Sequence, residues 1–154
     1  MIAEHYCKQM MVSQLKPSLQ DYWTLEYDLA RSGFAKDVYS AACLAANDDP
    51  LNEGKKNREE VLSNAVKEYE ILERDKGGAI EELCTHVYEM FHSKRASKAI
   101  AAQYFAALLL RSAKKPDFTA ASFKAKLPQY LVKAIEHVSF PEKPANAMGA
   151  HVNG

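Results

Sequence analysis

Apolar residues recur at intervals of three and four along most of the chain, and the strict alternation typical of a half-buried strand is absent. This spacing predicts helices at residues 2–15, 18–33, 34–46, 57–76, 79–92, 95–115, 119–126 and 128–138. We therefore expect an all-α fold, a single helical bundle of six to eight helices that occupies residues 1–139. Residues 140–154 combine prolines, glycines and asparagines, which favours a flexible C-terminal tail.

Residues that start or stop helices set the expected boundaries. Gly33 and the pair Gly77-Gly78 are expected to end helices. Asn57, with Glu60 three residues later, resembles a capping box, and the polar loop before it is expected to be mobile. A polar stretch after Ser93 predicts a turn or kink there, although one long continuous helix also fits the pattern.

The segment 95–115 is apolar on all sides of the expected helix in its middle. Such a pattern predicts a helix surrounded by other helices. A bundle this small has few fully surrounded positions, so part of this apolar surface is expected to be covered by neighbouring copies or by another subunit.

Charge is sorted along the chain although the total is zero. Residues 1–89 carry 10 Lys/Arg against 17 Asp/Glu, whereas residues 90–135 carry 9 Lys/Arg against a single acid, Asp117. This asymmetry indicates a surface that faces a polyanion, most simply nucleic acid.

Eight cations at the two ends of the helix 95–115 and in the helix after it are the candidate phosphate contacts. The two clusters are expected to lie about 25 Å apart, and the interleaved aromatic residues can stack on bases. As an alternative, the cations are ordinary solvated helix ends or face the acidic half of the same bundle. The candidate nucleic-acid-binding residues are Lys94, Arg95, Lys98, Arg111, Lys114, Lys115, Lys124 and Lys126.

No motif for catalysis or for a cofactor is present. His86 and His92 are six positions apart, which turns them away from each other on a helix, and no arginine has a histidine four to six residues after it as helical RNases of the HEPN type require. We therefore expect no enzyme activity, no cofactor and no metal site. Three widely spaced cysteines and the lack of a long apolar span indicate reduced thiols in a cytoplasmic protein with no membrane segment.

The helical chain, its size and its basic segment Lys94–Lys133 resemble the small subunits of class 1 CRISPR effector complexes over residues 2–138. By this resemblance the protein would pack in several copies along a crRNA filament, beside other subunits. It would hold DNA strands by their backbones without cutting them. The net charge of zero departs from a purely basic clamp, so the acidic first half must face solvent or protein.

The function expected from the sequence is therefore a non-catalytic subunit of a ribonucleoprotein complex that binds nucleic-acid backbones without sequence specificity. The main alternative is a helical protein–protein adaptor or inhibitor that uses its acidic N-terminal half.

Overall fold

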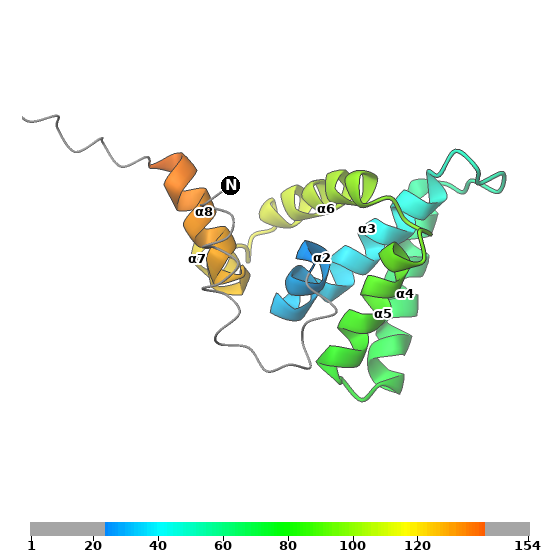
Figure 1. The fold of residues 1–154 in the computed structure, drawn as a ribbon, viewed down its shortest axis with the longest axis horizontal. Helices are drawn as coiled ribbons and strands as arrows, with labels where there is room; N and C mark the ends of the chain where they lie inside the picture. The colour runs from blue at the N-terminus through cyan, green and yellow to red at the C-terminus, as the bar shows by residue number, and fades with distance from the viewer. Residues whose placement is uncertain (1–23, 141–154) are drawn as a thin grey trace, which may run out of the picture.

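The computed structural model describes residues 24–140, and this part of the chain contains helices and no strand (Figure 1). The predicted all-α bundle is thus confirmed. The helix expected at 2–15, the start of the helix expected at 18–33 and the tail beyond Phe140 lie outside the described residues. The elements are α2 (Leu25–Leu29), the π-helical turn η2 (Ala30–Phe34), α3 (Ala35–Asn47), α4 (Arg58–Asp75), α5 (Ile80–His92), α6 (Lys98–Ala113), α7 (Ala120–Lys126) and α8 (Gln129–Ser139).

Helix α3 is the centre of the fold, and it contacts α4, α5 and α6 (Figure 1). Its buried positions include Ala35, Ala41, Ala42 and Ala45, whose short side chains let the neighbouring helices approach closely. The apolar stripe of α5, Leu83, Cys84 and Val87, is almost completely buried against this centre. An alanine-rich helix therefore serves as the packing hub, and it adds the larger buried side chains of Val38, Tyr39 and Leu44 to those of its neighbours.

Two glycine positions end helices as the sequence predicts. Gly33 has φ +107°, and the chain kinks there between α2 and α3. Gly78 has φ +73°, and its amide donates to the carbonyl of Glu73 over 2.9 Å, which closes the end of α4. Only glycine adopts these backbone angles at little cost. The hairpin between α4 and α5 is thus fixed by the glycine pair.

The turn predicted near Ser93 separates α5 from α6, so the alternative of one continuous helix is wrong. Lys94 has a positive φ of 58°, which no regular helix contains, and the Ala96 amide returns to the carbonyl of Met90 over 3.0 Å. Ser97 then caps α6 by accepting from the Ile100 amide. The turn lets α6 fold back across α3.

The prediction that residues 95–115 form a helix surrounded by others is wrong. Only Ala101 of α6 is buried, and Leu110 is 67% exposed. One side, which includes Tyr104, Phe105 and Leu108, packs against the core. The other side is made largely of alanines, which favour helix formation and expose little apolar area. This helix can therefore be apolar on every side and still be exposed on one of them.

Helices α7 and α8 follow at the far end of α6 (Figure 1). Thr119, the first residue of the helix expected at 119–126, caps α7, and Phe123 packs edge-on against Phe34 with ring centres 5.7 Å apart. Pro128 lies one position before the helix it was expected to begin, at the N-cap of α8, which buries only Val132. This end of the molecule is therefore attached through a few side chains. None of the helices between residues 24 and 140 has the length and apolar character needed to cross a membrane.

Candidate nucleic-acid interface

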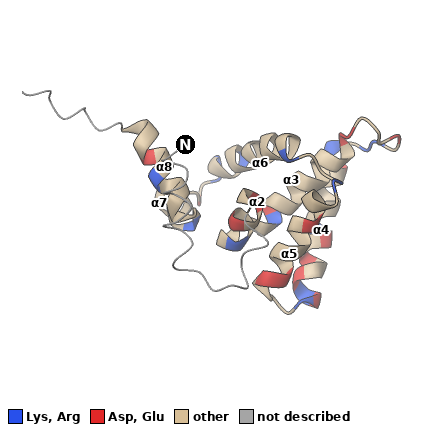
Figure 2. Cartoon of the chain, viewed as in Figure 1, with Lys and Arg blue, Asp and Glu red and all other residues tan. Residues whose placement is uncertain are grey.

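All eight predicted cations are exposed, and they gather at the two ends of α6 and in α7. Figure 2 shows Asp and Glu gathered on α4 and α5, whereas α6 carries only positive charge. Lys94 and Arg95 lie in the turn before α6, while Lys114 and Lys115 follow its last turn. The charge asymmetry of the sequence is therefore also an asymmetry in space.

Three of the eight cations form ion pairs. Lys98 contacts Glu26 of α2 over 3.1 Å, and Arg111 contacts Glu59 of α4 over 3.6 Å. For these two, the alternative that the basic segment faces the acidic half of the same bundle is confirmed. Lys124 contacts Glu136 of α8 over 2.6 Å, which links α7 to α8. Such exposed pairs stabilise a fold only weakly and can exchange for a phosphate.

The remaining five cations form no ion pair with any residue between 24 and 140. Arg95 donates to the Ser93 hydroxyl over 3.0 Å, and the other four have no hydrogen bond to a side chain of the described residues. These five residues form two clusters. We call Lys94 and Arg95 the turn cluster, and Lys114, Lys115 and Lys126 the distal cluster.

A cavity of about 130 Å³ lies beside the distal cluster, between α3, α6 and α7. Burial raises the pKa of the Asp37 carboxyl in its wall above the ordinary value, and the nearby Lys36, Lys126 and Lys115 oppose this rise. The cavity therefore combines an apolar wall with a partly buried carboxylate and an exposed lysine. Its lining consists of Phe34, Asp37, Leu109, Ser112, Phe118, Ser122, Phe123 and Lys126.

The aromatic residues interleaved with the cations have different surroundings. Phe118 and Phe123 are half-buried, 5.8 Å apart between ring centres, and both line the cavity. The Tyr130 hydroxyl donates to Asp28 over 3.0 Å, and burial together with this bond raises its pKa to about 12. His92 stacks on Tyr88 with ring centres 5.5 Å apart. The two phenylalanines thus share a cavity wall with Lys126 of the distal cluster, and His92 precedes the turn cluster by two residues.

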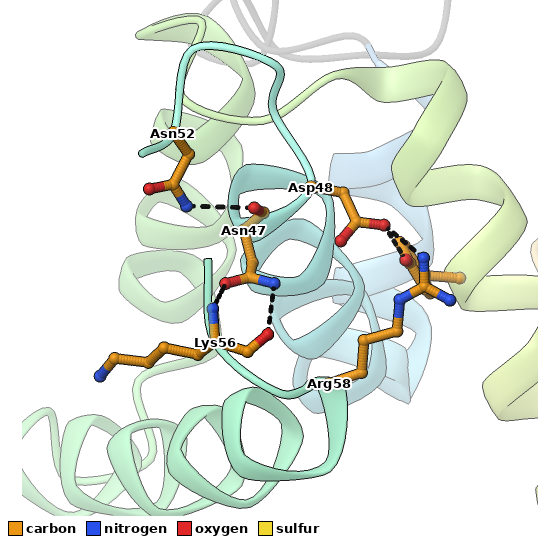
Figure 3. Close-up of polar contacts among 6 residues, drawn as sticks. Asn47, Asp48, Asn52, Lys56 and Arg58 are labelled. Carbon is orange, nitrogen blue, oxygen red and sulfur yellow. Dashed lines mark hydrogen bonds and ion pairs between the residues drawn. The ribbon is translucent and has the colours of Figure 1, made fainter. Parts of the chain in front are cut away.

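A polar junction that the sequence did not reveal joins α3, α4 and α6. Asp48 accepts hydrogen bonds from the Tyr104 hydroxyl and, over 2.8 Å, from the Arg58 guanidinium (Figure 3). These two bonds lower the pKa of the Asp48 carboxyl, and the guanidinium also lies 5.3 Å from the centre of the Tyr104 ring. No sequence signal identifies the junction, because Tyr104 is 56 residues away from Asp48.

The loop between α3 and α4, which was expected to be mobile, is held by the buried Asn47. The Asn47 side chain accepts from the Lys56 amide over 2.9 Å and donates to the Lys56 carbonyl over 3.1 Å (Figure 3). Asn52 in turn donates to the Asn47 carbonyl over 3.0 Å. Leu51 at the tip is nevertheless 90% exposed. The polar junction and this loop thus fix the N-terminus of α4.

The described residues do not gather three or more His, Cys, Asp or Glu side chains in a way that suits a metal ion. Cys43 and Cys84 are free thiols, and burial raises the pKa of each to about 11, which suppresses the reactive thiolate. The third cysteine, Cys7, lies outside the described residues. No protein-family model, curated protein or solved structure matches the chain.

Proposed function

We propose that this protein is a non-catalytic subunit of a larger ribonucleoprotein assembly and binds nucleic-acid backbones through the turn cluster and the distal cluster. The observation that carries the proposal is a set of five exposed cations that form no ion pair with residues 24–140, four beside the ends of α6 and Lys126 at the end of α7. Protein surfaces usually intersperse cations with acids. Here the acids of α2 and α4 pair with Lys98 and Arg111 and leave the five others available.

The spacing of the two clusters suits a strand that runs along α6. The helix has 16 residues and therefore spans about 24 Å. That distance covers several consecutive phosphates of a nucleic-acid strand. Four of the five cations are lysines, which act as point charges and carry no geometry for reading a base. We therefore expect contacts with the backbone and no sequence specificity.

The cavity beside the distal cluster supports an additional contact. A phosphate held by Lys126 would bring its base close to Phe118, and aromatic rings stack on bases of every kind. Lys98, Arg111 and Lys124, in contrast, must first give up an ion pair, so we assign them a secondary role. Their exchange from carboxylate to phosphate would add to the salt dependence of binding.

We also propose a cellular compartment and partners for this protein. Cys43 and Cys84 are unpaired thiols, which suits a cytoplasmic protein. Partner subunits and further copies of the chain remain part of the proposal through the resemblance to CRISPR small subunits.

The experiment that tests the proposal measures the affinity of the full chain for fluorescently labelled single-stranded RNA and DNA of mixed sequence. The variant Lys94→Glu/Lys115→Glu/Lys126→Glu reverses one charge in the turn cluster and two in the distal cluster. We expect its affinity to fall at least about tenfold for every sequence, and the slope of log affinity against log salt to shrink by about 2.

The matched control is Lys55→Glu/Lys67→Glu/Arg74→Glu, which makes the same change in net charge on the acidic side of the molecule. These three cations are exposed and form no ion pair with the described part of the chain. It should retain most of the affinity. A binding curve that does not respond to salt would contradict the proposal. So would an equal loss in the two variants, since that would reflect net charge alone.

A second function has one specific observation in its favour. The hairpin of α4 and α5 presents exposed carboxylates that form no ion pair with the described residues, namely Glu73, Asp75, Glu81 and Glu89. This surface suits an adaptor or inhibitor that imitates the charge of nucleic acid. Heparin resin separates the two functions, because it should retain a nucleic-acid binder and ignore a mimic.

A further inference from the structure

Helix α8 has an apolar face that the described residues leave largely open. Leu131, Ile135 and Val138 are spaced four and three residues apart, which places them on one side of the helix. Leu131 is half-buried, but Ile135 is 53% exposed and Val138 80% exposed. Phe140, directly after the helix, is also 80% exposed. The open face therefore begins at the middle of α8 and extends to its end.

The contacts that hold α8 are few and partly polar. Tyr130 bonds Asp28 of α2, and Glu136 pairs with Lys124 of α7. Leu127 and Leu131 add partly buried apolar contacts at its beginning. A helix of 11 residues is marginal in water without tertiary packing. Among residues 24–140, its second half thus finds few of the apolar contacts that usually stabilise a helix of this length.

The N-terminal segment of the same chain, residues 1–23, is a candidate to bind the apolar face of α8. Residues 1–23 precede α2, in which Glu26 contacts Lys98 at the start of α6 and Asp28 contacts Tyr130 at the start of α8. Leu25, the first residue of α2, is itself 48% exposed. The described chain therefore begins one helical turn before Asp28, the residue that contacts the start of α8.

The composition of residues 1–23 fits an apolar face, whereas the other end of the chain does not. Large apolar residues recur through the N-terminal segment, while residues 141–154 contain only Met148 and Val152 of this kind. The large apolar residues of the N-terminal segment are Ile2, Tyr6, Met10, Met11, Val12, Leu15, Leu19, Tyr22 and Trp23.

We propose that residues 2–23 pack against the face of α8 formed by Leu131, Ile135 and Val138 of the same chain. The segment thereby completes the small apolar layer at the α7–α8 end of the molecule. This inference does not depend on nucleic-acid binding, because it involves none of the five unpaired cations.

Hydrogen–deuterium exchange on the full chain tests the proposal. In the variant Ile135→Asp/Val138→Asp, amides within residues 2–23 should exchange about tenfold faster than in the unmodified protein, because charged side chains on α8 would release the segment. The reciprocal variant, Tyr6→Asp/Met10→Asp, should speed exchange in α8 to a similar extent. Unchanged protection in α3 and α5 would show that the fold persists in each variant.

Two features of the chain sharpen the experiment. Trp23 is the only tryptophan, so its fluorescence reports on the segment alone, and the α8 variant should shift its emission to longer wavelength. The control Leu51→Asp replaces an apolar residue by aspartate at the 90% exposed tip of the α3–α4 loop, and it should change neither measurement.

Three results would overturn the proposal. Exchange of residues 2–23 at the rate of an unstructured peptide in the unmodified chain would show that nothing is docked. Protection that the α8 variant leaves unchanged would place the segment elsewhere. Protection that appears only at concentrations where sedimentation shows a dimer would assign the face to a second copy of the chain.

Discussion

The region around α3 and the region formed by α7 and α8 use similar kinds of apolar residue and differ in what surrounds them. Around α3, helices α4, α5 and α6 enclose a core in which Leu83, Cys84 and Val87 are almost inaccessible. In α7 and α8 only Val132 is buried. The difference shows that burial in this small protein depends on having neighbours on several sides, which only the centre of a bundle provides.

The largest expected effect tests the core. Leu83→Ala should lower the free energy of unfolding by about 2–5 kcal/mol, because it removes a side chain that is 2% exposed and leaves a cavity. Urea denaturation measures the loss. Leu110→Ala, which removes the same atoms from the 67% exposed outer side of α6, should change stability by less than about 0.5 kcal/mol. Similar losses in the two variants would show that α6 is covered on both sides.

A smaller effect is expected where the two regions meet. Phe123→Ala removes the ring that contacts Phe34 and should cost about 1–3 kcal/mol, since Phe123 is only half-buried. Amide exchange should accelerate in α7 and α8 while α3 and α5 keep their protection. Lys124→Ala, which removes only the exposed ion pair with Glu136, serves as the control. An equal acceleration in α3 would mean that the two regions unfold as one unit.

The smallest effect concerns the polar junction, and it depends on pH. Tyr104→Phe removes the hydrogen bond that contributes most to holding the pKa of Asp48 below its ordinary value. A carboxyl with a lowered pKa stabilises the fold fully above its unfolded pKa, and this contribution disappears as the pH falls through the folded pKa. At neutral pH the variant should lose less stability than Phe123→Ala, because it removes a single hydroxyl group. Below about pH 4, the difference in stability between the variant and the unmodified protein should become smaller.

Thermal unfolding of the unmodified protein and Tyr104→Phe between pH 3 and 7 measures this difference. A difference that is independent of pH would mean that the Tyr104 hydroxyl does not act through the Asp48 carboxyl. Tyr69→Phe is the control, because the Tyr69 hydroxyl forms no hydrogen bond with the carboxyl of Asp48.

The helices and their ends followed closely from the sequence within residues 24–140. Gly33 and the pair Gly77-Gly78 act as predicted, and Asn57 caps α4, although it accepts from the Glu59 amide and not from Glu60 as in a capping box. Capping and left-handed backbone angles depend on one or two residues and their immediate neighbours. The exposure of the eight cations also followed from residue type, since a charged group without a partner is costly to bury.

The pairing of those cations was decided by the tertiary structure alone. Whether Lys98 forms an ion pair with Glu26, 72 residues earlier, or Lys115 forms none with residues 24–140 depends on how α6 crosses the bundle. The same crossing brings Tyr104 to Asp48 and leaves the alanine side of α6 open. Periodicity identifies a helix and its apolar positions, but it does not say how many sides of that helix find a neighbour. The number of neighbours follows from contacts between residues far apart in the chain. The helices could therefore be predicted from the sequence, whereas the exposed side of α6 and the pairing of its cations depend on the tertiary structure.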